Sequence, residues 1–276
     1  MKIKKWWQTP PVTYTFKSHE QPAMIGSPGV PDHPYRRKVF YALVGIVLAL
    51  TGGLQNGLLT AVLPQLQGFL ALTPAEGGWI LVTYNMVNAC MSMLLFKCRQ
   101  QFGLARFIRA IIFALVLCNL IQVTTHSYHS ELLARGISGL AASGMNALAL
   151  FYFIQAMPVK WRLKGIACSI SLSQVALPLA RAIAPSLMDD GNLQAVFWLQ
   201  LGLSLNVLVL VSLLPLPHGY TQKAISKTDL VSLLCFAFGV AALCAFFVQG
   251  RIVWWDKIEL GQLLLVALIG LGITLL

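Results

Sequence analysis

Long apolar runs separated by short polar connections dominate this chain of 276 residues. Most runs are close to the roughly 20 residues that an α-helix needs to cross the hydrocarbon core of a bilayer. The pattern therefore predicts eight transmembrane helices, the last of them near the lower length limit for a span. We place them at residues 39–63, 78–96, 107–125, 132–156, 165–187, 193–214, 229–249 and 260–276.

Two local patterns support these helices and indicate how they pack. Residues 73–76 read TPAE, which is typical of a capping box with proline at the first helical position. Gly53 and Gly57 in the first helix are a small-xxx-small pair, and Gly139 and Ser143 are another in the fourth. Such pairs allow two membrane helices to approach closely.

The composition fits a membrane protein and excludes other classes. Hydrophobic residues make up 57% of the chain and charged residues 11%, whereas roughly 25% of residues are charged in soluble proteins. Mean hydropathy is +0.73. So little charge cannot cover a soluble domain, and the apolar content and six cysteines exclude disordered and disulfide-rich chains. The expected fold class is an all-α membrane protein.

The basic residues predict how the helices are oriented. The net charge is +11, and 16 of the 20 Lys and Arg lie in the N-terminal segment or in the connections after the second, fourth and sixth helices. Because Lys and Arg gather on the cytoplasmic side of membrane proteins, we expect a cytoplasmic N-terminus and an even number of spans. The basic excess is then a topology signal, and nucleic acid is not an expected partner.

The predicted spans divide the chain into four parts. Residues 1–38 hold six of the 13 prolines, and we interpret them as a disordered, basic cytoplasmic tail. Residues 39–215 form the predicted six-helix bundle, 216–228 a cytoplasmic linker, and 229–276 two further transmembrane helices. The last helix ends on apolar residues without a polar cap, which we interpret as a truncation.

Polar side chains inside the predicted spans are the candidates for function. An arginine at mid-membrane costs about 2.5–3.5 kcal/mol on insertion scales, so it usually faces protein or a water-filled cavity. Arg135 lies about one turn into the fourth span. Arg181 lies nearer the outer end of the fifth, where snorkelling to the interface is an open alternative. None of the nine acidic residues lies deep in a span, and Glu131 is assigned to a helix N-terminus, where the helix dipole favours it.

These polar residues have two open interpretations. They either satisfy one another in hydrogen bonds between helices, or they line a shared aqueous pathway for a solute. The pathway interpretation includes the polar residues of the first, second, fourth and fifth spans, which are Gln55, Asn56, Tyr84, Asn85, Asn88, Arg135, Asn146, Gln174 and Arg181.

The sequence shows no catalytic or metal-binding constellation. The six cysteines form no CxxC pair and are interpreted as small packing residues. His126 and His129 lack carboxylate or cysteine neighbours in their short connection. We therefore expect neither an enzyme nor a bound metal or other cofactor.

Four stretches follow one another in a familiar order. They read LQNGLLTAVLP at 54–64, ARGISGLAA at 134–142, RLKG at 162–165 and ALPLARAIAP at 176–185. They resemble the motifs LDxTxVNxALP, ARxxQGxGAA, RGxAxG and GPxLGPxLGG of the major facilitator superfamily, specifically of its 14-span drug/proton antiporters. The resemblance implies two six-helix bundles with an extra helix pair between them, and efflux of small organic solutes.

The resemblance also assigns roles to single positions. Arg135 is carried over as a functional residue, whereas the family's first-helix acid, which is implicated in proton coupling, aligns with Gln55. The family's gating loop GxLADRxGRR aligns with residues 96–106, where Gly103 and Arg106 remain and the Asp is missing. We therefore do not expect proton coupling by the family's usual route.

These observations favour an efflux-type permease of small organic solutes, or its N-terminal portion, in the inner membrane of a cell. Two arginines and no acid deep in the spans favour an anionic or neutral solute over a cation. Two alternatives stay open. One is a transport-incompetent remnant of a longer protein, and the other is a non-transport membrane subunit that pairs with a chain supplying a second bundle.

Overall fold

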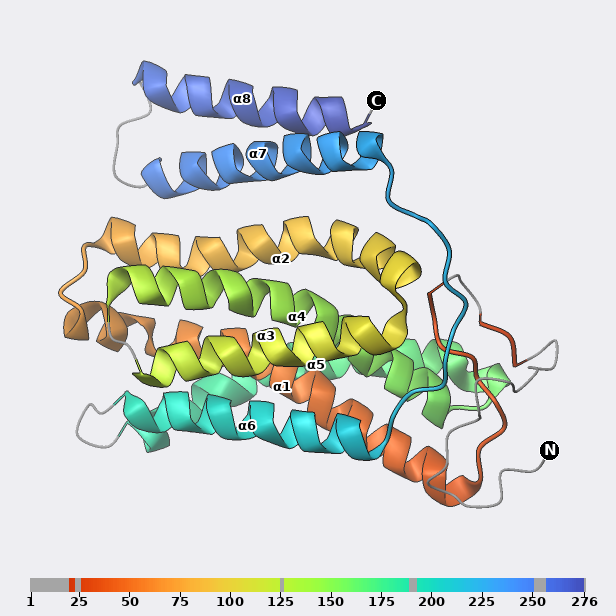
Figure 1. The fold of residues 1–276 in the computed structure, drawn as a ribbon. Helices are drawn as coiled ribbons and strands as arrows, with labels where there is room; N and C mark the ends of the chain where they lie inside the picture. Colours follow the sequence, from red (N-terminus) through yellow and green to blue (C-terminus); the bar gives the residue numbers. More distant parts are fainter. Residues whose placement is uncertain (1–19, 23–25, 125–126, 189–192, 251–256, 276) are drawn as a thin grey trace.

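The computed structural model describes residues 20–22, 26–124, 127–188, 193–250 and 257–275. Within these ranges the chain is helical, with one short 3-10 helix and no strand (Figure 1), which confirms the all-α class. The helices are α1 (Tyr35–Phe69), α2 (Pro74–Phe102), α3 (Leu104–Thr124), α4 (Tyr128–Ala156), η1 (Val159–Trp161), α5 (Arg162–Leu187), α6 (Gln194–Leu213), α7 (Lys227–Gln249) and α8 (Ile258–Leu275).

Seven helices, α1 to α7, are long and apolar enough to cross a membrane, whereas α8 is shorter over its described residues. Most of the helices begin before the predicted spans, and two of them also end well beyond. The reason is that hydropathy marks only the hydrocarbon-spanning part, while backbone hydrogen bonding continues into the polar interface. Helix α1 passes through Pro64 to Phe69, and the predicted capping box at the start of α2 is present, with Thr73 and Glu76 bonded reciprocally.

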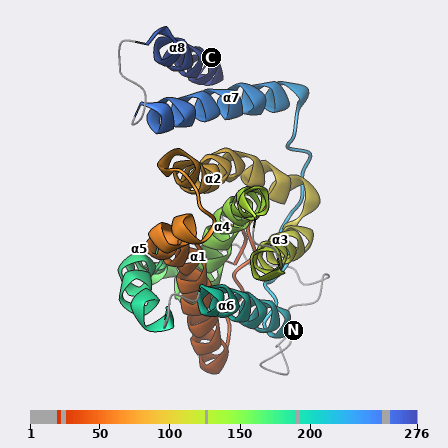
Figure 2. The same ribbon diagram turned by 90° about the vertical axis from the view of Figure 1, so that its left-hand side faces the viewer.

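Helices α1 and α4 form the centre of the bundle. Helix α1 packs on α4, α5 and α6, and α4 also packs on α2 and α3 (Figures 1 and 2). Small residues set the closest approaches, because a Cβ on Gly53 would collide with the Ser173 carbonyl oxygen and one on Gly57 would lie 2.9 Å from the Ala180 Cβ. The predicted small-xxx-small pair of α1 therefore lies at its contact with α5.

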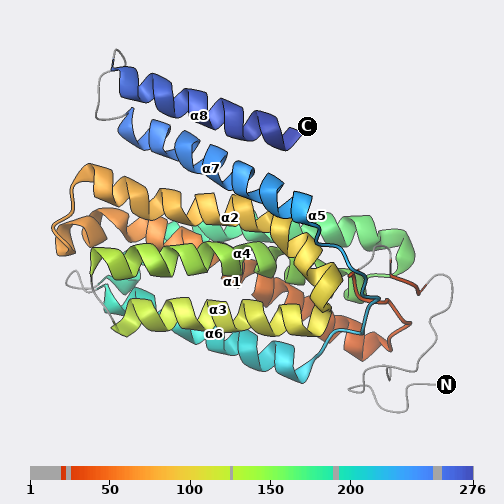
Figure 3. The same cartoon turned by 45° about the horizontal axis from the view of Figure 1, so that its top comes forward.

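Helices α7 and α8 form a hairpin outside the bundle. Helix α7 runs alongside α2, and α8 lies on the far side of α7 (Figure 3). Gly239 and Gly270 bring the two helices together, since a Cβ on Gly239 would lie 2.9 Å from the backbone nitrogen of Leu271. An ion pair between Lys97 and Asp229 joins α2 to the start of α7.

The N-terminal segment differs from the expected disordered tail. Residues 26–34 pack against the connection after α6, where the Gly26 and Gly29 amides donate to the carbonyl oxygens of Tyr220 and His218 at 3.1 and 3.2 Å. Helix α1 already begins at Tyr35, so the part of the tail nearest the bundle is ordered. The segment supplies backbone donors to a connection that has no helical partners of its own.

His33 anchors this segment to α4. Its Nε2 lies 2.9 Å from Gln155 Oε1, and Gln155 Nε2 donates to the Gly29 carbonyl oxygen at 2.7 Å. The bond to Gly29 orients the Gln155 amide so that its Oε1 accepts a hydrogen bond from His33 Nε2. The neutral imidazole therefore carries its proton on Nε2. His33 Nδ1 is unprotonated and is buried without a partner in the described structure. Burial lowers the pKa of His33 from 6.5 to about 4, so the imidazole is neutral near pH 7.

Candidate functional site

The guanidinium of Arg135 is enclosed where α1, α2 and α4 meet, and only 1% of the residue is exposed. Its Nη2 donates to Asn56 Oδ1 at 2.7 Å. Its Nη1 and Nε donate to the carbonyl oxygens of Gln55 and Ile80 at 3.5 and 3.4 Å. The guanidinium carbon lies 4.4 Å from the centre of the Tyr84 ring, a cation–π distance. One positive charge thus links three helices through neutral acceptors.

Close contact between α2 and α4 places Arg135 over Tyr84. Gly139 lies one turn after Arg135, and a Cβ at this position would lie 2.5 Å from the Tyr84 carbonyl oxygen. Only glycine therefore allows the two backbones to touch here. The second predicted small-xxx-small pair thus positions the arginine.

Glu131 differs from the expectation for the acidic residues. It lies in the first turn of α4 as predicted, yet only 1% of the residue is exposed. Gln122 of α3 donates from Nε2 to Glu131 Oε2 at 3.2 Å, and Arg135 lies one turn further along α4. The bundle thus encloses a carboxylate near its arginine. Nothing in the sequence pattern marks it as buried, because burial depends on α3 covering this end of α4.

Gln55 lies inside the bundle, and only 2% of it is exposed. Gln200 of α6 donates from Nε2 to the Gln55 carbonyl oxygen at 3.2 Å, and Asn119 of α3 donates from Nδ2 to the Gln200 carbonyl oxygen at 3.3 Å. Gln55 Nε2 and Gln200 Oε1 are buried without a partner in the described part of the chain. Gln200 and Asn119 each lie in an otherwise apolar run, so periodicity alone does not single them out.

The other predicted residues are distributed over α2, α4 and α5, and we refer to this set as the open face. Asn85, Asn146, Gln174 and Arg181 are exposed, and Asn88 is half-buried. The opposite side of α5 packs on α1 through small residues. Within the described ranges, Asn146, Gln174 and Arg181 have no hydrogen-bond partner, while Asn85 Nδ2 donates to the carbonyl oxygen of Leu81 in its own helix at 3.1 Å. The predicted site therefore consists of an enclosed part around Arg135 and this open face.

The sequence pattern of the Major Facilitator Superfamily matches residues 44–276, which is most of the chain. The chain belongs to the Major Facilitator Superfamily. It is therefore a multi-pass membrane transporter of a small solute, and not an enzyme. A search of curated proteins finds no match.

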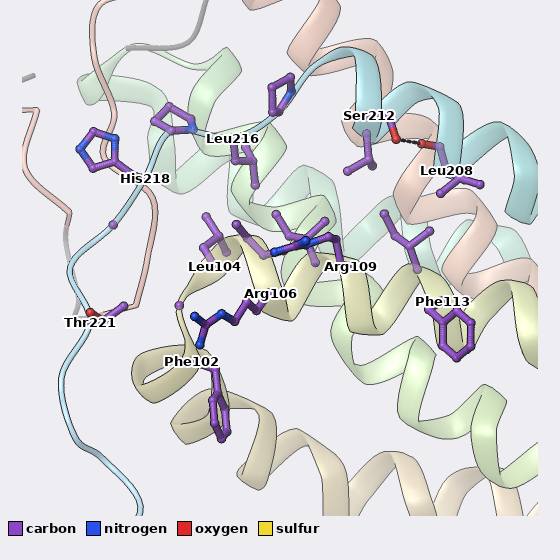
Figure 4. A pocket seen from close by; sticks show the side chains of 18 of the residues that line it. Phe102, Leu104, Arg106, Arg109, Phe113, Leu208, Ser212, Leu216, His218 and Thr221 are labelled. Atoms are coloured by element: carbon purple, nitrogen blue, oxygen red, sulfur yellow. Dashed lines mark hydrogen bonds between the residues drawn. The ribbon is translucent and has the colours of Figure 1, made fainter. Parts of the chain in front are cut away.

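Residues 96–106, the predicted gating loop, lie at the junction of α2 and α3 in this superfamily transporter. Helix α2 continues through Phe102, so most of the expected loop is helical, and only Gly103 separates α2 from α3. Gly103 has a φ of +83°, a conformation that favours glycine. Arg106 lies exposed in the first turn of α3 and lines a pocket at this end of the bundle (Figure 4).

No group of three or more His, Cys, Asp or Glu gathers to hold a metal ion in the described parts of the transporter. His126, one of the two histidines weighed for such a site, lies outside these residues.

Proposed function

We propose that this superfamily transporter exports a small anionic or neutral organic solute along the open face of α2, α4 and α5, and that it is similar to the drug/proton antiporter branch. The observation that carries the proposal is the exposure of Asn146, Gln174 and Arg181 on helices long enough to span a membrane. Unpaired amides and a guanidinium are costly against hydrocarbon. This face therefore meets water or another polar surface, as a solute pathway does.

Charge supports the choice of solute. Arg181 is the charged residue of the open face, and the second arginine, Arg135, is bonded only to neutral acceptors. The enclosed Glu131 partly offsets Arg135, but it does not lie on the open face. A positive local potential attracts an anion and repels a cation.

In this proposal Arg135 positions the pathway and does not contact the solute in the described conformation. Its guanidinium holds the Asn56 amide and stacks over Tyr84. It thereby fixes how α1, α2 and α4 lie relative to one another. Displacing it would change the spacing of the helices that carry Asn85 and Asn146.

The same proposal includes an orientation and a second bundle. The basic connections lie at the end of the bundle where α1 begins (Figure 1), which supports a cytoplasmic N-terminus in an inner membrane.

We keep residues 39–215 as the first six-helix bundle, 216–228 as the linker and 229–276 as the extra helix pair. Transporters of this type rock one bundle against another around a central site, so a second bundle, supplied by a longer form of the protein or by a partner chain, would face α2 and α5.

Solute uptake into inside-out vesicles tests the proposal. Vesicles containing the full chain receive one anionic, one neutral and one cationic fluorescent dye. We expect uptake of the anionic or neutral dye, loss of the anionic preference in Arg181→Gln, and reduced uptake in Gln174→Leu. The matched control is Asn206→Leu, because Asn206 is exposed on α6 and bonds only to its own helix. Equal uptake by all variants, or preference for the cation, would overturn the proposal.

A further inference from the structure

A pocket of about 870 Å³ opens at the basic end of the bundle, away from Arg135 (Figure 4). It lies between α3, α6 and the connection that follows α6, and the junction at Gly103 closes one side. This volume is in the range of small-molecule sites, which span about 300–1,000 Å³. No part of the proposed solute pathway lines it.

The wall nearest the end of the bundle is positively charged. Arg106 and Arg109 lie three residues apart on α3, so they share one face of the helix, and Figure 4 shows both side chains at the pocket. Within the described residues neither arginine forms an ion pair with a carboxylate; Arg109 Nε donates only to the Ala105 carbonyl oxygen of its own helix, at 3.3 Å. His218 completes this wall from the connection after α6.

The start of α3 adds to this positive potential. The amides of Leu104, Ala105 and Arg106 belong to the first turn and precede the first helical hydrogen bond, which runs from the Phe107 amide to the Gly103 carbonyl oxygen at 3.2 Å. Free amides and the helix dipole at an N-terminus favour an anion. The two arginines and the helix N-terminus therefore all favour the binding of a negatively charged group at this end of the pocket.

The remaining wall of the pocket is apolar and continues into the surface that faces lipid. Ile112, Val116 and Val211 line its inner part. Phe113 and Leu208 also line it and are 69% and 40% exposed on the outer sides of α3 and α6. The pocket is thus charged where the helices leave the membrane and apolar towards its interior. An amphiphile oriented like a membrane lipid has the same polarity.

We propose that this pocket binds one anionic glycerophospholipid of the surrounding leaflet. Its phosphate lies against Arg106 and Arg109, and the upper part of one acyl chain lies between α3 and α6. Guanidinium groups bind phosphate through paired hydrogen bonds, and basic pockets between membrane helices select anionic headgroups. The bound lipid joins α3 to α6 and to the connection after it, so it stabilises this end of the bundle.

Binding to the full chain in a neutral detergent tests this site, with native mass spectrometry and thermal unfolding as readouts. We expect phosphatidylglycerol to bind and to raise the Tm, and phosphatidylcholine to bind much more weakly. The double variant Arg106→Gln/Arg109→Gln should weaken phosphatidylglycerol binding about 30-fold, because each arginine near an anionic lipid contributes about 1 kcal/mol and 1.4 kcal/mol corresponds to a factor of ten. The control Lys160→Gln/Lys164→Gln removes two exposed charges at the same end, outside the pocket, and should bind like the wild type.

Two further arms separate a lipid from a free anion. Leu208→Trp fills the apolar part and leaves both arginines in place, so it should weaken phosphatidylglycerol binding even if the arginine variant does not fold. Inorganic phosphate alone should raise the Tm little. Equal stabilisation by inorganic phosphate, equal binding of phosphatidylcholine, or unchanged binding by Leu208→Trp would each overturn the proposal. Solute transport is not measured here, so the outcome is independent of the proposed function.

Discussion

Replacing Asn56 by alanine removes the shortest hydrogen bond of Arg135, the 2.7 Å contact to its Nη2. Hydrogen bonds to charged groups contribute about 1.5–3 kcal/mol, while those between membrane helices reach at most about 1.7 kcal/mol. The change also leaves a guanidinium N–H unpaired in a site that is 1% exposed. We therefore expect Asn56→Ala to lower the free energy of unfolding by about 2 kcal/mol.

A double-mutant cycle with Arg135→Met measures the interaction itself. The free energy of unfolding is determined for the full chain in mixed micelles by denaturant titration. Because methionine keeps an unbranched side chain but removes the donors, the coupling between the two changes should be about 1.5 kcal/mol. Asn206→Ala is the control, since this exposed amide bonds only to the Gly202 carbonyl oxygen of its own helix, at 3.0 Å. Additive effects, or an Asn56→Ala effect as small as that of the control, would refute the role assigned to this contact.

Two other predictions concern packing and pH. Gly53→Val should cost about 1–3 kcal/mol of stability, because its Cβ meets the Ser173 carbonyl oxygen, whereas Gly202→Val, with open space around it, should be tolerated in the same denaturant titration. Because the pKa of His33 is about 4 in the folded chain and 6.5 otherwise, the packing of residues 26–34 is fully stable above pH 6.5 and weakens as the pH falls towards 4. The loss should be about 2 kcal/mol at pH 5, measured by hydrogen exchange of the Gly29 amide after correction for intrinsic rates. An identical pH slope in His33→Gln would contradict this origin.

Hydropathy and local motifs predict the helices well because both depend on neighbouring residues. Seven of the eight expected spans coincide with helices that can cross a membrane. The capping box at residues 73–76 and the close approaches at Gly53 and Gly139 also follow from short patterns. The helix ends are less well predicted, since a helix continues beyond the hydrocarbon wherever its backbone stays bonded.

The polar residues show where the sequence is insufficient. Helical spacing places Arg135 and Asn146 on one face of α4, yet the structure encloses the first and exposes the second. Arg135 is enclosed because acceptors of α1 and α2, at Gln55, Asn56 and Ile80, surround its guanidinium, and no local pattern of α4 records that. Glu131 is similar, since α3 covers it from 9 residues away through Gln122.

The sequence by itself therefore determines the class of protein, the number and order of its helices and the small residues at which they meet, because length, hydropathy and side-chain size act locally. Only the tertiary structure decides which polar groups are enclosed and which are open, that residues 26–34 are packed, and that Arg106 and Arg109 share a pocket with α6. The physical reason is that burial and electrostatic potential at a residue are produced by helices distant in sequence.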